Sequence, residues 1–280
     1  MNKRNLFKAA VSMLLILIMS VGVIFVSTPE TYAASSGKLV KTVKQYYKSG
    51  KKWKLSRKTT YKYNSKKDPI KITETYKIGK KTHKTIYTIK YTYKSGKKVT
   101  AKKYVKYDSD KKVLDSKTTY DSKGRPSVID YYDQDDPSIS ISSEKLVYGK
   151  NGYVTKIKSG FGDDTVIKYK WRGSKAKSLK SNMVIDGEKY KKALTVFNKK
   201  GFVQKPTVYT QADPVMIYTY KYNKGLVKTA NVEMQEGYDR YYERYTLTYT
   251  KKSISQKRYR AMINAAVCGD YPDTIGTTWY

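Results

Sequence analysis

The chain has 280 residues, with 58 Lys and Arg against 23 Asp and Glu, a formal net charge of +35, and 30 Tyr. One Cys excludes a disulfide scaffold, and one His with one Cys leaves no ordinary zinc site, so we predict no metal and no cofactor. This length suits one large all-β domain or two smaller ones.

The first 33 residues have the pattern of a secretory signal peptide. A basic start over residues 1–8 precedes an uncharged apolar run over 9–26, and Thr31 and Ala33 place small residues where signal peptidase reads. We expect cleavage between Ala33 and Ala34, export, and no membrane span afterwards. The alternative is an uncleaved anchor, because the apolar run approaches the roughly 20 residues that span a bilayer.

After residue 34 the chain alternates with the period of two residues that is typical of β-strands. In residues 85–93 one face carries Tyr and Ile, among them Ile89 and Tyr91, and the other carries Thr88 and Lys90. Strict alternation indicates a sheet with one covered face and one face in water. The same scheme recurs in residues 165–171, 216–222 and 241–249.

Short turns rich in Gly, Asn, Asp and Lys separate the predicted strands, for example around Gly50, Gly96 and Gly124. Gly and Asn supply the positive φ that hairpins require, so neighbouring strands should be antiparallel. No spacer is long enough for a crossover helix. We therefore predict an all-β fold, a long antiparallel β-meander over residues 34–252 with a Tyr-rich covered face, and a candidate sub-boundary near 133–140.

The end of the chain has a different pattern. From residue 253 apolar residues such as Ile254, Tyr259 and Ile263 recur at helical spacing, after the candidate caps Ser253 and Ser255. We predict a short C-terminal helix over one end or face of the sheet, with a tail to residue 280. We assign no role to the single thiol, Cys268.

One turn resembles a known repeat. Residues 120–125, Tyr-Asp-Ser-Lys-Gly-Arg, are similar to the core of the YD repeats of Rhs-type bacterial surface and toxin-shell proteins, and weaker versions start at Tyr107, Tyr148, Phe197 and Tyr222. In that family each repeat is a β-hairpin stacked into an extended or spiralling sheet. The resemblance implies a hairpin array and brings no catalytic residues.

Enzyme chemistry has little support in the sequence. The only histidine, His83, lies among lysines at a strand start, where we expect an outward side chain, and no Gly-x-Ser-x-Gly elbow occurs. A glycosidase needs only two carboxylates, so a secreted carbohydrate-active enzyme stays an alternative. Turn chemistry competes for the Asp pairs, and Arg240 or Arg244 could pair with Glu243. The candidate carboxylates are Asp135, Asp136, Asp163, Asp164, Glu233, Glu236 and Glu243.

Positive charge is concentrated in the first part of the mature chain. Residues 34–111 hold 25 Lys and Arg against 4 acidic residues, a net +21, whereas residues 112–280 hold 30 against 18, a net +12. Alternate turns of a meander emerge at the same edge, about 10 Å apart. We therefore expect turn lysines to gather at two edges, with outward Lys62, Lys71, Lys90, Lys102 and Lys106 between them. One edge should carry Lys51, Lys52, Lys80, Lys81, Lys111 and Lys112, and the other Lys66, Lys67, Lys97 and Lys98.

Two interpretations of this charge compete. Lysines keep an exposed sheet soluble and block edge-to-edge pairing. Alternatively they bind an anionic polymer, since mixed charges would serve solubility without the self-repulsion of a +21 block. The composition is typical of a Gram-positive bacterium, where teichoic acids, anionic glycans, lipid headgroups and extracellular DNA are the nearest polyanions. No base-reading motif is present, so we predict no specific nucleic-acid recognition.

The leading functional hypothesis is an exported, non-enzymatic module of the cell surface or wall. It would bind an anionic polymer or have a structural role, and charge would retain it on the wall. Two alternatives stay open: the carbohydrate-active enzyme, and a YD-repeat-like adhesin or toxin-shell fragment.

Overall fold

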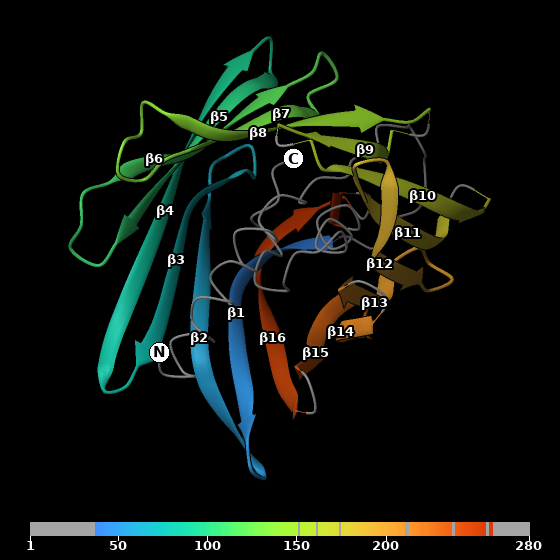
Figure 1. Ribbon diagram of the computed structural model, residues 1–280. Helices are drawn as coiled ribbons and strands as arrows, with labels where there is room; N and C mark the ends of the chain where they lie inside the picture. Colours follow the sequence, from blue (N-terminus) through green and yellow to red (C-terminus); the bar gives the residue numbers. More distant parts are fainter. Residues whose placement is uncertain are drawn as a thin grey trace.

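The computed structural model describes residues 37–150, 152–160, 162–173, 175–210, 213–236, 239–255 and 258–259. Its strands follow one another round a closed antiparallel barrel (Figure 1), which confirms the predicted all-β meander and adds its closure. The strands are β1 (Gly37–Ser49), β2 (Lys52–Tyr63), β3 (Pro69–Ile78), β4 (Lys81–Lys94), β5 (Lys97–Tyr107), β6 (Val113–Tyr120), β7 (Pro126–Tyr132), β8 (Ser140–Tyr148), β9 (Val154–Ser159), β10 (Asp164–Arg172), β11 (Lys175–Ile185), β12 (Glu188–Phe197), β13 (Val203–Thr210), β14 (Asp213–Asn223), β15 (Leu226–Glu236) and β16 (Asp239–Ile254).

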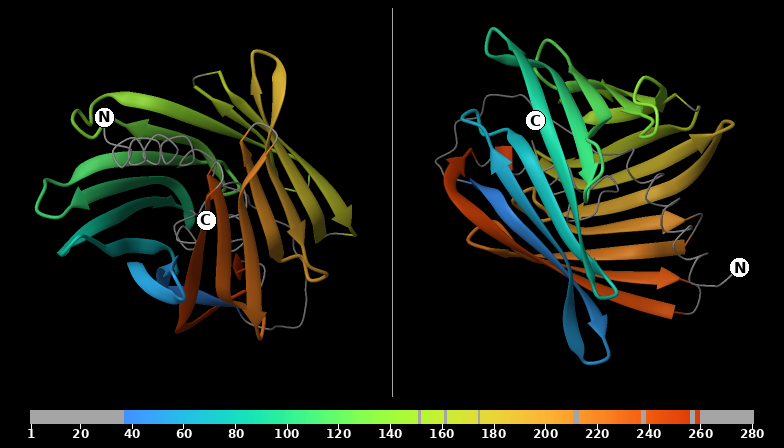
Figure 2. Two further views of the ribbon diagram at one scale, coloured as in Figure 1. Left: turned by 60° about the horizontal axis from the view of Figure 1, so that its bottom comes forward. Right: turned by 90° about the vertical axis from the view of Figure 1, so that its left-hand side faces the viewer.

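The barrel closes where its first and last strands pair. The β1–β16 register runs from Gly37 opposite Ile254 to Tyr47 opposite Glu243, with two irregularities around Val40. Each remaining strand pairs with its sequence neighbours, including β7 with β8 across the 133–139 loop. Figure 2 shows the strands arranged round the wall, with the blue β1–β2 hairpin projecting at one end. Closure leaves no strand edge of the barrel unpaired.

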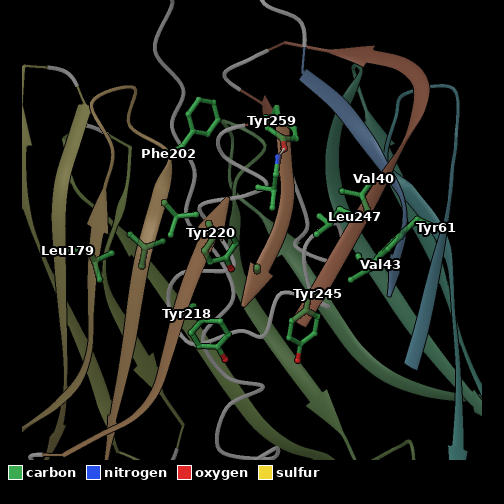
Figure 3. Packing of buried hydrophobic residues seen from close by; sticks show 14 of the residues in the cluster. Val40, Val43, Tyr61, Leu179, Phe202, Tyr218, Tyr220, Tyr245, Leu247 and Tyr259 are labelled. Carbon is green, nitrogen blue, oxygen red and sulfur yellow. Dashed lines mark hydrogen bonds between the residues drawn. The ribbon is translucent and has the colours of Figure 1, made fainter. Parts of the chain in front are cut away.

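The two faces of the wall differ as the alternation predicts. On β4, Ile89 is buried and Lys90 exposed, and on β14, Tyr220 is 4% exposed whereas Lys221 is exposed. Only the concave side of a closed barrel is shielded by the wall itself, so the buried face lines the inside. Figure 3 shows part of this lining. The predicted Tyr-rich covered face is the inner lining, and the Lys- and Thr-rich face is the outside.

The abundance of Tyr follows from the width of the barrel. Small barrels are filled by ordinary side chains, but the interior widens with strand number, and barrels of 16 strands enclose a large lumen. Tyr reaches far inward and carries a hydroxyl that can bond to a backbone group. Tyr218 and Tyr245 accordingly lie almost fully buried in the lining.

One end of the barrel carries an aromatic residue near the end of every even-numbered strand, and we call this end the aromatic rim. In most of these hairpins the strand register shifts immediately before the aromatic residue, as at Tyr63 and Tyr148. Such bulges bend the strand and redirect side chains. The aromatic residues are Tyr63, Tyr93, Tyr120, Tyr148, Trp171, Phe197, Tyr222 and Tyr249.

Tyr hydroxyls join neighbouring strands at the aromatic rim. The Tyr63 hydroxyl donates to the carbonyl of Val40 at 2.8 Å, and the Tyr148 hydroxyl donates to that of Pro126 at 2.6 Å. Each bond connects an even strand to the start of the strand before it, and so holds the open end of a hairpin together. Equivalent bonds run from Tyr91 to Pro69, Tyr169 to Val154, Tyr222 to Val203 and Tyr249 to Val227.

The YD-like sequence has a physical basis in the turns of this rim. The Asp121 N–H donates to the carbonyl of Arg125, and the Asp121 carbonyl accepts the N–H of Gly124. The Asp121 carboxylate accepts the N–H groups of Lys123 and Arg125, both at 2.9 Å. Gly124 has φ 73°, the left-handed conformation that closes a three-residue hairpin loop. Asn198 bonds its turn in the same way.

The predicted C-terminal helix starts later than expected. Ser253 and Ile254 lie in β16, because its pairing with β1 extends to Gly37. A helical turn follows, in which the Ser255 hydroxyl accepts the N–H of Arg258 at 3.1 Å, as an N-cap does.

Tyr259 in that turn is fully buried, and its hydroxyl accepts the N–H of Val227 at 2.7 Å. The rest of the predicted helix, the tail, Cys268 and the signal peptide with its Ala33–Ala34 site lie outside the described residues. Among the residues that the structure describes, no helix is long and apolar enough to cross a membrane.

Candidate polyanion-binding surface

The turn lysines lie at the two ends of the barrel. The turns after β1, β3 and β5 emerge at the end opposite the aromatic rim, which we call the opposite rim, and the turns after β2 and β4 emerge at the aromatic rim. This is the two-edge arrangement that a meander requires. The opposite rim carries Lys51, Lys52, Lys80, Lys81, Lys111 and Lys112, all exposed, and the aromatic rim carries Lys66 and Lys97, exposed, with Lys67 and Lys98.

Lys98 is not a surface lysine, although the sequence predicted that it lies with the exposed turn lysines. Its side chain is 10% exposed, and its Nζ lies 3.2 Å from Oδ1 of Asp68. Burial lowers the pKa of Lys98 to about 8, an effect that the neighbouring Asp68 carboxylate opposes. The register shift after Thr92 accompanies this change of side, since Lys98 pairs with the inward Tyr93. Lys67 is half-buried, and its Nζ donates to the carbonyl of Ser253.

Asp68 is the centre of a buried polar network at the aromatic rim. Besides Lys98, its carboxylate accepts hydrogen bonds from Arg258 at 3.0 Å and from the Tyr93 hydroxyl at 2.7 Å. Arg258 also donates to the carbonyl of Lys67. This network fixes the residues after β16 to the β2–β3 turn, so we assign it a structural role.

The acidic side chains of the first six strands do not share the outer face with the lysines. Glu74 and Asp115 point inside, where they pair with Arg57 at 3.6 Å and Lys103 at 2.8 Å. Together with Asp68 they are hidden from the outer surface. Asp108 and Asp110 lie in the β5–β6 turn.

His83 is placed differently from the prediction. It is half-buried on the same face as Thr85, because it continues the inward alternation of β4. Its ring stacks on Tyr76 at 5.6 Å, and its Nδ1 lies 2.7 Å from Oδ2 of Asp108. The N–H of Lys84 and then His83 lower the pKa of Asp108. His83 therefore belongs to a local pair at the rim.

Five outward lysines form an oblique row across β2 to β6, which we call the lysine track. Lys62 pairs with Lys71, and Lys102 has Lys90 on one side and Lys117 on the other. The Cβ atoms of directly opposed residues lie about 5 Å apart, and diagonal neighbours such as Lys71 and Lys90 lie about 7–8 Å apart. Within the described part of the chain, none of the five forms an ion pair with a carboxylate. The lysine track consists of Lys62, Lys71, Lys90, Lys102 and Lys117.

The lysines predicted to point outward include every member of the lysine track except Lys117, because the alternation in residues 113–120 is weak. Lys106, predicted outward as well, is half-buried opposite Ile86 and lies off the row.

The outer face of the later strands mixes acids and bases, although Lys145 lies opposite Lys158 and Lys168 opposite Lys180 there as well. Lys156 pairs with Asp164 at 2.5 Å, and Arg240 with Glu233 at 3.1 Å. Asp130 on β7 lies opposite Lys117 and ends the lysine track. The track lysines of β2 to β6 thus run as one row, whereas the outer face of the later strands carries ion pairs.

The candidate carboxylates are dispersed rather than gathered. Asp135 and Asp136 lie in the β7–β8 loop, where both donate their N–H groups to Asp133. Ser138 donates to Asp136 and lowers the pKa of its carboxyl. These bonds are the turn chemistry that competed with a catalytic interpretation.

The remaining candidates have separate positions. Asp163 is exposed beside β10, and the backbone of Glu236 pairs with that of Asp239 at the end of β15. Glu243 points inside and accepts hydrogen bonds from Gln45 and Tyr245. Arg244 instead donates to Asn231. Among the described residues, no group of three His, Cys, Asp or Glu side chains is placed to hold a metal ion.

A small pocket of about 180 Å³ lies at the aromatic rim, between β8 and β10. Three of its aromatic residues pack on one another, with ring centroids 4.9 to 5.4 Å apart. No carboxylate lines it, so it does not supply the acid pair that a glycosidase needs. It is lined by Gly149, Lys150, Tyr153, Thr155, Ile167, Tyr169 and Trp171.

Comparison with known structures finds one fold-level similarity. A crystal structure of a porin-like protein from Bacteroides uniformis matches with a TM-score of 0.50 and 12% identity, over 75% of this chain and 98% of that chain. A crystal structure of TcdB2-TccC3 matches 82% of this chain and 20% of that one, with a TM-score of 0.22 and 9% identity. No protein-family model and no curated protein matches the chain.

Proposed function

We propose that this protein is an exported, non-enzymatic module of the cell surface or wall that binds anionic polymers on the outer face of β1 to β6. The observation that carries the proposal is the separation of charge across this wall. Asp68, Glu74 and Asp115 are turned inward, whereas the outer face carries lysines. Inward Arg57, Lys103 and Lys98 neutralise these acids, so the net positive charge of this region lies on the outer face, where it attracts polyanions.

Closure of the barrel weakens the competing interpretation. Lysines protect a sheet against edge-to-edge pairing only where an edge exists. Here β1 pairs with β16, so the barrel wall has no free edge for them to protect. Solubility stays as the rival explanation for the outer lysines. A soluble surface does not require lysines to lie opposite one another on neighbouring strands.

The polarity of the wall also distinguishes the proposal from a lipid-embedded barrel, which the porin-like neighbour could suggest. Transmembrane barrels expose an apolar band and have a polar interior, and a Lys at the bilayer midplane costs about 2–4 kcal/mol. This barrel has the reverse pattern, with Tyr220 and Ile89 inside and Lys90 and Lys221 outside. We infer contact with water and polymer rather than with acyl chains.

Secretion and retention on the wall by charge belong to the same proposal. The first described strand begins at Gly37, after the expected cleavage site at Ala33–Ala34. Removal of the signal peptide would therefore leave the closing strand β1 whole.

The Asx-bonded turns of the aromatic rim favour a YD-repeat-like adhesin or shell fragment as a second candidate.

Binding across a salt series tests the proposal. Purified mature protein should bind teichoic acid or heparin at low salt, with affinity that falls steeply as salt rises, because counterions are released. Changing Lys51, Lys52, Lys80 and Lys81 to Gln should lower the slope of log affinity against log salt by up to about 3. The matched control changes Lys168, Lys199, Lys200 and Lys224 to Gln and should have a smaller effect. Absence of binding at low salt, or equal losses in both variants, would contradict the proposal.

A further inference from the structure

The register of the outer face places like charges opposite one another. Lys62 lies opposite Lys71, and Lys102 lies between Lys90 and Lys117. Like charges directly opposed on neighbouring strands destabilise a sheet. Neighbouring outward positions are filled by Thr, as at Thr92 opposite Thr100, so a neutral strand former suits this wall. The lysine track therefore has a cost in the free protein that solubility does not require.

We propose that the lysine track binds a linear, densely charged phosphate polymer that lies obliquely across β2 to β6. This inference rests on the proposed function and names its site and its ligand. Lysines whose Cβ atoms lie about 5 Å apart across strands can all be paired only by a chain that carries a charge on each short repeat. A glycan with one carboxylate per disaccharide would leave lysines of the track unpaired.

The residue type agrees with a phosphate chain. Lys binds phosphate as a point charge and imposes no planar geometry, whereas Arg favours bidentate recognition. The track consists of Lys only, which suits a flexible chain held without a fixed register. Lys62, Lys90 and Lys102 of the track are exposed, and Lys71 and Lys117 are half-buried.

The track also has defined surroundings. Tyr104 lies beside it, with the Nζ of Lys90 5.7 Å and the Nζ of Lys112 4.7 Å from its ring centroid. This contact holds both ammonium groups near one ring. At β7 the track ends, because Asp130 lies opposite Lys117 and would repel a polyanion. The bound segment should therefore extend from β2 to β6.

The test compares two variants of equal charge in the full mature chain. One changes Lys90, Lys102 and Lys117 to Gln, and the control changes the exposed Lys189, Lys205 and Lys221, which lie opposite Val184, Val196 and Thr229. With long-chain inorganic polyphosphate at low salt, we expect the track variant to lose about tenfold or more in affinity, and the control about twofold. Wild type should bind polyphosphate more tightly than hyaluronan by a similar factor.

A second readout is independent of the ligand. Without polymer, the Tm of the track variant should rise, because repulsion between opposed lysines is removed, while the Tm of the control should stay close to wild type. A fall in Tm would show that these lysines support the wall and would overturn the inference.

The failures of the two proposals can be told apart. No binding of any polyanion at low salt would refute the proposed function, and the track with it. Binding that the track variant and the control lose equally would refute the track alone. Equal affinity for hyaluronan and polyphosphate would refute the assignment to a dense phosphate chain.

Discussion

The two rims of the barrel show how differently the ends of one repeated hairpin can be built. At the aromatic rim, Tyr hydroxyls such as those of Tyr63 and Tyr148 bond to the neighbouring strand, and Asx residues close the turns. At the opposite rim, large apolar side chains such as Leu55, Ile78 and Ile139 are about half exposed. The hairpins are thus fastened at the aromatic rim, which leaves the opposite rim free to vary in turn length and charge.

High pH should cause the greatest loss of stability, because of the buried tyrosines. Burial raises the pKa of Tyr259 to about 12 and raises the pKa of Tyr63, Tyr148 and Tyr222 well above the usual value. The unfolded chain ionises near pH 10 and then binds fewer protons than the folded one, so stability present below pH 10 is lost as pH rises. Tyr259 alone accounts for about 2–3 kcal/mol between about pH 10 and 12.

Urea unfolding followed by circular dichroism between pH 7 and about 11.5 measures this loss. Lys98 acts in the opposite direction between about pH 8 and 10, since its folded pKa of about 8 lies below that of the unfolded chain. A rise in stability before the fall is therefore expected, and Lys98→Gln should remove it. Constant stability up to pH 11.5 would mean that water reaches the rim hydroxyls.

A smaller effect is expected when an inward tyrosine is truncated. Tyr220→Ser and Tyr91→Ser should each destabilise by about 2–4 kcal/mol, because large buried groups are lost. The matched controls Lys221→Ser and Lys90→Ser change the outer face and should cost within about 0.5 kcal/mol. Chemical denaturation of the four variants provides the measurement. Equal costs on both faces would contradict the assignment of an inner and an outer face.

The smallest effect concerns single hydroxyl groups and compares the rims directly. Tyr148→Phe should destabilise by about 1 kcal/mol, because it leaves the Pro126 carbonyl without its partner. Tyr120→Phe should be neutral or slightly stabilising, since the Tyr120 hydroxyl is buried with no hydrogen-bond partner in the described structure. Tyr190→Phe serves as the control, because Tyr190 is exposed and lies at the opposite rim. A loss in Tyr120→Phe as large as in Tyr148→Phe would mean that the hydroxyl bonds do not fasten this rim.

Local patterns in the sequence predicted the strands, their faces and the ends at which turn lysines emerge. Alternation and turn residues are short-range signals, and the inward Ile89 and outward Lys90 follow from them directly. Closure was not predictable in this way, because Gly37 and Ile254 meet without any sequence signal that links them.

The side-chain directions predicted from the sequence were wrong or missing where the regular alternation is interrupted or where the pattern is ambiguous. Lys98 follows a register shift and turns inward to Asp68, although it belongs to a pair of turn lysines. The opposition of Lys102 and Lys117 depends on the register between β5 and β6, which a single strand does not encode. His83 obeys the alternation of β4, and its cationic neighbours were a poorer guide than its position in the strand.

The pairing of β1 with β16 also sets an order of assembly. Every other pairing joins strands that are adjacent in the chain, and so can form as the chain is synthesised. β1 is made early, yet its second neighbour is complete only at residue 254. Until then β1 has one unpaired edge, so the time between the first hairpin and the last is the period in which this protein is most exposed to intermolecular pairing.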